Sequence, residues 1–424
     1  MRYIDLDYTP REDDLLVFYY FEPADGISKE EAVEAIAGES SIGTWTDVTT
    51  MKEEIKLKLK PCVYELKNNH VKIAYSSELF EKGNIPQILS SIAGNIFGMK
   101  AVKNLRLIDV RFPPEILDSM PGPYFGIQGV RDVFKVKDRP LVGTIVKPKV
   151  GLDEKEFAEV VYNALSGGCD FVKDDENLTN MSFNEFKKRV KLSLEMAKRA
   201  EEETGEKKAY LPNITAPYKE MLKRAEYVKN LDGKYIMIDV VTAGFSALQS
   251  IREENFGMII HAHRAMYAAF ARNKRHGIST LAFSKLVRLA GADQLHIGTV
   301  VGKMEGEKRE ILAIQEEMKS NEFEGNEMFF PQEWRKIKPL FPVASGGLHP
   351  FLIPELYLLF GKDIIMMFGG GVHGHPKGST AGARTVRMIL DAVIKNKDIK
   401  TVVQKEEVRI AYEKWGKKRW EGSS

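Results

Sequence analysis

The sequence predicts an α/β protein in which a (β/α)8 barrel of the TIM type follows a smaller α+β domain with a ferredoxin-like order of elements. Three observations support this prediction. The first part of the chain alternates strand-like and helical patterns without repeating. A stretch with four prolines, residues 112–123, then interrupts the pattern. After it, eight short apolar runs alternate with amphipathic helical stretches, as expected for a barrel of this kind.

The first domain is expected to run β-α-β-β-α-β. Its first helix spans residues 28–37 and begins with Ser28 and Glu31, which have the spacing of a capping box. The other expected elements are strands at 15–21, 63–66, 71–75 and 105–111 and a helix at 85–97. Because prolines disfavour continued helix or sheet pairing, the boundary is placed after residue 122, which gives domains 1–122 and 123–424.

The eight apolar runs of the second domain are interpreted as barrel strands. They lie at residues 143–146, 171–173, 209–211, 235–241, 258–263, 294–297, 342–345 and 364–368. A doubly wound open sheet is the alternative, since periodicity alone does not show whether a sheet closes. Polar residues follow nearly every run, and the carboxyl ends of barrel strands meet at one mouth, where active sites lie. The pattern therefore favours a barrel with one site, followed by a helical tail from residue 395.

Composition argues against several classes of partner. The chain has 62 Lys and Arg residues and 60 Asp and Glu residues, a formal net charge of +2 without long runs of one sign. Nucleic-acid and membrane binding are therefore not expected. The longest apolar run, residues 15–21, is too short to span a bilayer, and the N-terminus lacks a signal-peptide layout. A cytoplasmic protein with reduced Cys62 and Cys169 is expected.

The segment around residues 171–176 carries the strongest chemical signal. Asp175 and Glu176 follow a predicted strand and offer the hard oxygen ligands that Mg²⁺ prefers. A free ammonium at Lys173 cannot serve as a third ligand, but a carbamate formed from its neutral amine and CO₂ would supply further oxygens. Neighbouring acids oppose loss of the proton, whereas burial and nearby lysines favour it. The sequence alone leaves the balance open.

Two glycine clusters suggest where phosphate binds. Ser345–Gly347 and Gly369–Gly371 follow the seventh and eighth predicted strands, whose loops often bind phosphate in barrels. Arg264 and His296 suggest a second anionic pole, so the substrate is expected to carry phosphate at both ends. Lys303, in a loop bracketed by glycines, could close over an anionic transition state.

The pair His261 and His263 leaves open an alternative function as a metal-dependent hydrolase. Their i, i+2 spacing on one strand face can ligate zinc, as in a hydrolase with a carbamylated lysine. The late position of the pair and the carboxylates at 175 and 176 favour the magnesium alternative.

Long motifs resemble the large subunit of ribulose-1,5-bisphosphate carboxylase/oxygenase (RuBisCO). They include GTIVKPKVGL, GGCDFVKDDEN, HAHRAM, LHIGTVVGKMEGE, VASGG, FGGGVHGHP, ESSIGTWT and GNIFGMKAVKNLRLIDVRFP, and they span nearly the whole chain. The chain is most similar in character to the archaeal form III branch, which acts in the breakdown of AMP and other nucleoside monophosphates.

The resemblance implies roles for individual residues. Lys173 is similar to the carbamylated lysine that binds Mg²⁺ with Asp175 and Glu176 and acts as a base. The implied proton-transfer and loop residues are Lys147, His263 and Lys303, with Lys149 supporting Lys147. The implied substrate-binding residues are Arg264, His296, Ser345, Gly347, Gly369 and Gly370. The residues implied to reach the active site of a neighbouring subunit are Glu39, Thr44, Trp45 and Asn95.

The resemblance also implies an activity and an assembly. The expected reaction is carboxylation of ribulose 1,5-bisphosphate with CO₂ and water to two 3-phosphoglycerates, with O₂ as a competing substrate. A homodimer, or a ring of dimers, without small subunits is expected. The alternatives are a RuBisCO-like enolase or isomerase and a phosphosugar-binding scaffold. Tyr267 and Ile145 depart from the plant-type pattern, which has a histidine and a threonine there.

Overall fold

The computed structural model describes residues 2–46, 48–299, 301 and 305–416. Contacts between Cα atoms divide the chain into two compact units. Unit 1 comprises residues 1–122, 266–291 and 320–338. Unit 2 comprises residues 123–265, 292–319 and 339–424. The units are therefore not the two linear domains, 1–122 and 123–424, expected from the sequence, because two later segments pack with the first.

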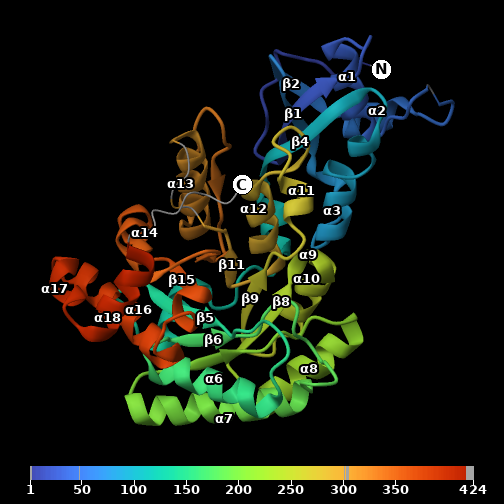
Figure 1. The fold of residues 1–424 in the computed structure, drawn as a ribbon. Coiled ribbons are helices and arrows are strands. Elements are labelled where there is room, and N and C mark those ends of the chain that lie inside the picture. The colour runs from blue at the N-terminus through green and yellow to red at the C-terminus, as the bar shows by residue number, and fades with distance from the viewer. Residues whose placement is uncertain (1, 47, 300, 302–304, 417–424) are drawn as a thin grey trace. The chain divides into compact units, whose positions relative to one another are not determined.

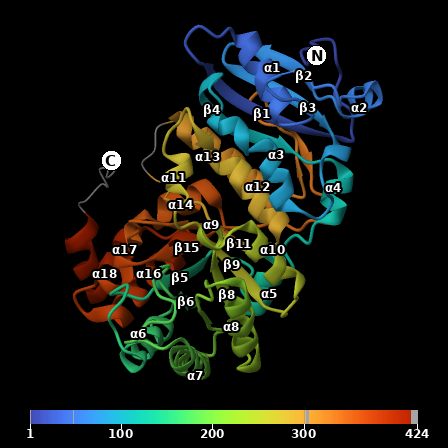
Figure 2. The same cartoon turned by 90° about the vertical axis from the view of Figure 1, so that its right-hand side faces the viewer.

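Unit 1 is built on a sheet with the strand order β10-β4-β1-β3-β2 (Figure 2). Its strands are β1 (Asp14–Pro23), β2 (Cys62–Lys67), β3 (His70–Ser76), β4 (Val102–Arg111), β10 (Gly277–Ile278) and the separate pair β12 (Glu322–Phe323) and β13 (Gln332–Glu333). Its helices are α1 (Lys29–Glu39), α2 (Glu53–Leu59), α3 (Ile85–Ile92), α4 (Pro114–Ser119), α11 (Ala268–Ala271) and α12 (Thr280–Ala290). The antiparallel order β4-β1-β3-β2 confirms the ferredoxin-like prediction.

Local sequence signals explain most of these elements. Ser28 accepts a hydrogen bond from the backbone of Glu31, whose side chain returns one, so the predicted capping box is present. The helix predicted at 85–97 begins at the expected residue, but its predicted end was wrong. It stops at Ile92, and a 3-10 turn follows at Asn95–Gly98. Gly94, with ψ −127°, lies outside helical conformation and turns the chain.

The two later segments join unit 1 through backbone pairing and a buried charge. β10 extends the sheet by pairing in parallel with β4. Lys285 of α12 places its Nζ 2.8 Å from Oδ1 of Asp109 on β4, and both side chains are buried. The other oxygen of Asp109 accepts a 2.8 Å hydrogen bond from the backbone of Phe330. A single buried carboxylate thus connects three sequence segments, and linear patterns give no sign of it.

Unit 2 contains an eight-stranded parallel sheet in the order β7-β6-β5-β15-β14-β11-β9-β8 (Figure 1). A parallel bridge between Asn213, just after β7, and Met237 on β8 joins the two ends, so the sheet closes into the predicted barrel. The strands are β5 (Leu141–Ile145), β6 (Phe171–Lys173), β7 (Ala209–Leu211), β8 (Tyr235–Asp239), β9 (Ile259–His263), β11 (Gln294–His296), β14 (Phe341–Ser345) and β15 (Ile365–Phe368). The run expected at 235–241 is two residues shorter as a strand, because α9 begins at Val240.

Helices surround these strands, and Figures 1 and 2 show α6, α7 and α8 on their outer side. The helices of unit 2 are α5 (Gly126–Phe134), α6 (Glu154–Ser166), α7 (Phe186–Thr204), α8 (Tyr218–Asn230), α9 (Val240–Ala243), α10 (Phe245–Glu253), α13 (Glu305–Lys319), α14 (Ile353–Phe360), α15 (Gly370–His373), α16 (Gly378–Ile394), α17 (Ile399–Val403) and α18 (Glu406–Ala411). Across the described part of the chain, no helix has the length and apolar character needed to cross a membrane.

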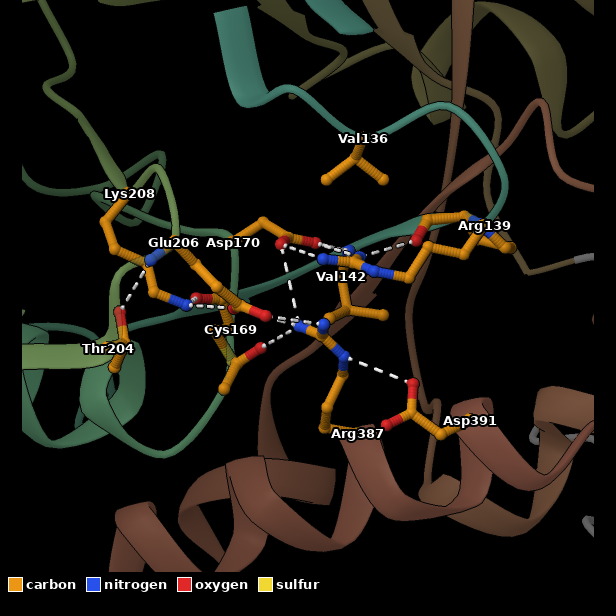
Figure 3. Close-up of polar contacts among 12 residues, drawn as sticks. Val136, Arg139, Val142, Cys169, Asp170, Thr204, Glu206, Lys208, Arg387 and Asp391 are labelled. Atoms are coloured by element: carbon orange, nitrogen blue, oxygen red, sulfur yellow. Dashed lines mark hydrogen bonds and ion pairs between the residues drawn. The ribbon is translucent and has the colours of Figure 1, made fainter. Parts of the chain in front are cut away.

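The amino-terminal ends of the barrel strands are held by a buried charge network (Figure 3). Asp170, directly before β6, accepts hydrogen bonds of 2.7 and 2.6 Å from Arg139 and one of 2.8 Å from the backbone of Val142 on β5. Arg387 of α16 lies 3.8 Å from Asp170 and donates a 2.8 Å hydrogen bond to Glu206. The network ties β5, β6 and α16 together at the end of the barrel opposite the predicted site.

Candidate active site

Most of the predicted site residues in unit 2 lie at the carboxyl ends of the barrel strands. They follow or end strands β5, β6, β9, β11, β14 and β15. Because the strands are parallel and the sheet is closed, these ends meet at one mouth. Closure of the barrel therefore brings together residues that are far apart in the sequence, such as Lys147 and Gly369, which are 222 positions apart.

Lys173 is the most deeply buried of these side chains. It ends β6, is fully buried, and donates a 2.9 Å hydrogen bond from Nζ to the carbonyl oxygen of Asp174. Its other close neighbour is the Met237 sulfur, at 3.4 Å. Burial lowers the pKa of the Lys173 amine, although the charges of Glu176 and Asp175 act in the opposite direction. Burial is thus the larger of the two effects, and it shifts the pKa of the amine downward from its ordinary value.

The two carboxylates that follow β6 are each paired with a lysine from the loop after β5. Lys147 Nζ donates a 2.7 Å hydrogen bond to Asp175 Oδ2, and Lys149 Nζ lies 3.6 Å from Glu176 Oε1. Burial alone would raise the pKa of Asp175, but the hydrogen bond and charge of Lys147 lower it to about 2. Asp175 is therefore an ionised carboxylate at neutral pH, the form that binds a cation.

His263, at the end of β9, bridges two acidic groups. Its Nε2 lies 3.7 Å from Glu176 Oε2, and its Nδ1 lies 3.3 Å from Asp239 Oδ1. Burial, followed by the charge of Lys173, lowers the pKa of His263. The ring is thus a neutral proton acceptor or donor beside the carboxylates.

Asp239 was missed in the sequence analysis. It is the last residue of β8 and is almost fully buried, and its Oδ1 has no hydrogen-bond partner among the described residues. Its Oδ2 accepts a 3.3 Å hydrogen bond from Asn213. The signal was available, because an acidic residue closing the apolar run YIMID follows the same rule as the other site residues.

His261 and His296 form a buried hydrogen-bonded pair. Their Nε2 atoms are 2.7 Å apart, and His296 Nδ1 lies 2.6 Å from Ser345 Oγ. The remaining nitrogen of His261, Nδ1, lies 2.7 Å from Gln294 Oε1. Burial lowers the pKa of His261 to about 3 and that of His296 in the same direction. Because both nitrogens of His261 are engaged, the HxH pair is not arranged to ligate zinc.

The glycine clusters lie where β14 and β15 end. Gly346 and Gly347 have φ values of 97° and 67°, which favour glycine. Thr299 donates a 2.6 Å hydrogen bond to the carbonyl of Ser345 and holds this turn. At the second cluster, the Lys147 side chain passes close to Gly369, where an added Cβ would lie 3.4 Å from its Cε. The candidate phosphate loops thus adjoin both the lysine and the histidine parts of the site.

Two polar residues beneath the second cluster were also missed. Thr144 on β5 lies 2.9 Å, through Oγ1, from His373 Nε2 and donates a hydrogen bond to the carbonyl of Phe368. His373 Nδ1 in turn lies 2.9 Å from Ser379 Oγ. This network connects the end of β5, which leads to Lys147, with the turn after β15.

The remaining predicted residues lie in different parts of the chain, and one of them is not described by the structure. Arg264 lies against Gly298, where a side chain would collide with its guanidinium group. Lys303 lies outside the described residues. In unit 1, Asn95 Nδ2 donates a 3.5 Å hydrogen bond to Glu39 Oε1, and Trp45 is 92% exposed, with Thr44 next to it. Their participation in a site stays a prediction.

The two departures from the plant-type pattern have structural counterparts. Tyr267 is buried within unit 1, where its hydroxyl donates a 3.0 Å hydrogen bond to the carbonyl of Ile278 and its ring packs on Phe283. Ile145 ends β5 and packs against the hydrophobic core of the barrel. Neither residue supplies a charge.

A cavity lies at the amino-terminal end of the barrel strands. This cavity of about 440 Å³ is lined in part by Arg139, Asp170, Glu206 and Arg387, the residues of the network in Figure 3. Those charged groups pair with one another, so the cavity lies over a structural network. The predicted site residues lie at the opposite mouth of the barrel.

Comparisons with known proteins identify the family of the chain. Residues 126–415 match the sequence model of the ribulose bisphosphate carboxylase large chain, catalytic domain, and residues 2–116 match that of its N-terminal domain. A ribulose bisphosphate carboxylase from Methanocaldococcus jannaschii is 53% identical over 427 residues, covering 98% of this chain and 100% of the relative. One from Methanosarcina barkeri is 51% identical over 424 residues, covering 98% and 99%.

Solved structures give the same result. The dimeric archaeal Rubisco from Hyperthermus butylicus superposes with a TM-score of 0.92 at 46% identity, covering 98% of each chain. The octameric enzyme from Pyrococcus horikoshii, crystallised with sulfate, has a TM-score of 0.91 at 49% identity, covering 98% of this chain and 96% of that one. The chain therefore belongs to the ribulose bisphosphate carboxylase large-chain family and is a carboxylase.

Proposed function

We propose that the enzyme adds CO₂ and water to D-ribulose 1,5-bisphosphate and releases two molecules of 3-phosphoglycerate. One observation carries the proposal: a fully buried lysine with a lowered pKa, Lys173, lies beside the carboxylates of Asp175 and Glu176. A neutral amine is the form that adds CO₂, and the resulting carbamate would give three oxygen-bearing groups. The names of the relatives support the same substrate.

The residues fit a magnesium ion. Asp175 and Glu176 supply hard oxygen donors, and the low pKa of Asp175 keeps it charged. The Oδ1 of Asp239, at the end of β8, lies 3.3 Å from His263 Nδ1 but receives no hydrogen bond from the described residues, so it is a further buried acceptor. We propose that carbamylated Lys173, Asp175 and Glu176 hold Mg²⁺, which when bound stabilises negative charge on substrate oxygens.

We propose separate roles for the other side chains of the site. Lys147, hydrogen-bonded to Asp175, is placed to give or take a proton at the reacting carbon. His263, neutral and flanked by Glu176 and Asp239, assists proton transfer during hydration. Lys149 pairs with Glu176 and supports the metal-binding carboxylate. Lys303, which lies outside the described residues, is proposed to cover the intermediate.

Two phosphate poles are proposed for the substrate. Gly347, Gly369 and Gly370, with Ser345 at the start of the first cluster, would surround one phosphate, and Arg264 with His296 would face the other. Both nitrogens of His296 are hydrogen-bonded in the structure, to His261 and Ser345. A direct contact from His296 to phosphate therefore requires one of these bonds to be exchanged.

The finer features of the family are proposed with the activity. O₂ is expected to compete with CO₂ for the same enediolate, and the product is expected to serve AMP or nucleoside breakdown. We also propose a homodimer without small subunits, in which Glu39, Thr44, Trp45 and Asn95 complete the site of the neighbouring subunit. A cytoplasmic location stays a prediction.

The test is the variant Lys173→Ala. We expect it to lose CO₂- and Mg²⁺-dependent formation of labelled 3-phosphoglycerate from ¹⁴CO₂ and the bisphosphate. The control is Lys191→Ala, which removes an exposed lysine of α7. Full activity in the first variant would overturn the proposed mechanism. Turnover of the bisphosphate by the unmodified enzyme without label in phosphoglycerate would favour an enolase or isomerase.

A further inference from the structure

A largely buried histidine connects the second glycine cluster with the neighbouring strand β5. His373 is the last residue of the short helix α15, which begins at Gly370. Its Nε2 lies 2.9 Å from Thr144 Oγ1 on β5, and its Nδ1 lies 2.9 Å from Ser379 Oγ in the first turn of α16. The imidazole ring therefore bridges the strand that pairs with β15 and the helix that follows the turn.

The hydrogen bonds of Thr144 fix the direction of this bridge. The Thr144 hydroxyl donates to the carbonyl oxygen of Phe368, and a hydroxyl has only one hydrogen to give. Toward His373 the Thr144 oxygen can therefore only accept, which requires the ring hydrogen to be on Nε2. Burial, followed by the charge of Lys147, lowers the pKa of His373 to about 4. The ring is thus neutral at pH 7, and its Nδ1 accepts from the Ser379 hydroxyl.

The backbone of the same histidine is part of the glycine turn. Its N–H group donates a 3.1 Å hydrogen bond to the carbonyl oxygen of Gly369, and the N–H group of Gly374 donates one of 2.9 Å to the carbonyl oxygen of Gly370. Because glycine has no side chain, residues 369–371 depend on neighbouring groups for their position. The His373 ring supplies such a connection, from this turn to β5.

We propose that His373 is a positioning residue which, by donating from Nε2 to Thr144, holds the turn at residues 369–371 in the position that binds a substrate phosphate. This inference rests on the proposed function, which places one phosphate at this turn. His373 itself would not touch the substrate, since both of its ring nitrogens are engaged within the protein. Its contribution is to connect the phosphate turn with the strand that leads to Lys147, whose side chain passes close to Gly369.

Three substitutions of His373 test which of its hydrogen bonds matters. His373→Leu removes both ring nitrogens, and we expect it to weaken binding of a non-reacting pentitol bisphosphate about tenfold, the effect of losing one hydrogen bond of about 1.4 kcal/mol. His373→Gln carries an amide nitrogen near the position of Nε2 and should restore most of the affinity. His373→Asn carries its amide near the position of Nδ1 and should stay weakened. The opposite order of the two amides, or full affinity in His373→Leu, would overturn the proposal.

Thr144→Val tests the same hydrogen bond from its other partner. Once this acceptor is absent, adding His373→Leu should weaken binding no further, because both substitutions remove one shared bond. The matched control is Thr385→Val, which removes a buried hydroxyl on α16 that has no hydrogen-bond partner among the described residues, and binding should be unchanged. Additive losses in the double variant would show that His373 acts independently of Thr144 and would refute the positioning role.

Steady-state kinetics separates positioning from a general loss of stability. In His373→Leu, the KM for the bisphosphate should rise by the same factor by which binding weakens, while kcat stays close to that of the unmodified enzyme. A fall in kcat at unchanged KM, which is expected when a smaller fraction of the enzyme is folded, would assign His373 a structural role only.

The position of the ring hydrogen can be measured without turnover. ¹⁵N NMR of histidine-labelled enzyme without substrate, with the His373 signal assigned by its absence in His373→Gln, should show the hydrogen on Nε2. A hydrogen on Nδ1 would contradict the proposal even in an enzyme that carboxylates the bisphosphate. Conversely, bisphosphate binding that depends on His373 in an enzyme that does not carboxylate would refute the proposed function and leave this inference standing.

Discussion

At the scale of single residues, the protonation of the site depends on two opposing effects. Burial disfavours the charged form of each group, and nearby groups of opposite charge favour it. Lys173 is surrounded by acidic groups, yet burial has the larger effect on its pKa. Asp175 shows the opposite result, because its hydrogen bond to Lys147 outweighs burial. Both pKa values are lowered, which favours the neutral form of the Lys173 amine and the ionised form of the Asp175 carboxylate.

Asp239 is the residue-scale position at which a small change should have a large effect. In Asp239→Asn, the negative charge that lies 3.3 Å from His263 Nδ1 is lost. That charge raises the pKa of His263, so the ring of the variant would be harder to protonate. We expect kcat to fall roughly tenfold to a hundredfold, as is typical when the charged partner of a functional side chain is lost.

The measurement is steady-state carboxylation across pH, together with a thermal melt. A structural role alone would lower the melting temperature without changing the pH profile of kcat. An unchanged kcat and pH profile in a folded Asp239→Asn enzyme would show that the charge of Asp239 does not influence His263.

At the scale of elements, the turns after β14 and β15 are packed directly against each other. A Cβ added at Gly371 would collide with the backbone carbonyl of Leu348 and lie 2.9 Å from Cα of His349. Backbone atoms cannot rotate away as a flexible side chain can. The two glycine clusters therefore have a fixed separation that depends on the absence of a side chain at residue 371.

We expect Gly371→Ala to raise KM for the bisphosphate roughly tenfold to a hundredfold, because separating the turns misplaces the phosphate contacts. Steady-state kinetics measures this effect. Gly98→Ala is the control, since an added Cβ there meets nothing within 4 Å. An unchanged KM in Gly371→Ala would place phosphate binding elsewhere.

The charge network at the amino ends of β5 and β6 is the second element-scale feature. Asp170 is buried, and its two oxygens accept hydrogen bonds from Arg139. In Asp170→Asn, the Arg139 guanidinium would stay buried without its counter-charge, so we expect the free energy of unfolding to fall by roughly 3–5 kcal/mol.

Urea denaturation checks this expectation against a matched variant. Asp391→Asn removes a half-exposed carboxylate that pairs with Arg387 in the same network, and it should cost less than about 1 kcal/mol. Equal effects of the two substitutions would show that burial of Asp170 has little energetic consequence.

At the scale of the whole molecule, buried neutral histidines should dominate the pH dependence of stability just below neutrality. The pKa of His261 is lowered to about 3 and that of His373 to about 4, in both cases chiefly by burial. The unfolded chain binds these protons near pH 6.5, before the folded one does, so stability falls as pH drops below about 6.5. Carboxylates with lowered pKa values, such as Asp175 and Glu206 at about 2, lose their contribution only below about pH 4.5.

We therefore expect the free energy of unfolding to decrease between pH 7 and pH 5, with a limiting slope of about 1.4 kcal/mol per pH unit for each such histidine. His373→Gln should reduce the total decrease over this range by roughly 2 kcal/mol. Urea titrations at the two pH values measure the difference. An identical decrease in the variant would mean that His373 is protonated in the folded protein.

Much of the fold could be predicted from the sequence because the signals are local. The strands at 171–173 and 209–211 were predicted to the residue, and the capping box at Ser28 and Glu31 forms as expected. The rule that polar residues follow strands also located Lys173, Asp175, Glu176 and His263. The same rule applied to residue 239 would have located Asp239.

Other features were decided by the tertiary structure alone. Sequence determined that strands and helices alternate and which chemical groups follow each strand, since periodicity and residue type act over a few neighbouring positions. Only folding decided that the sheet closes, that Asp109 gathers three distant segments, and that burial outweighs nearby acids at Lys173. Burial and hydrogen-bond direction depend on what surrounds a side chain in three dimensions, and residues far apart in the sequence supply those surroundings.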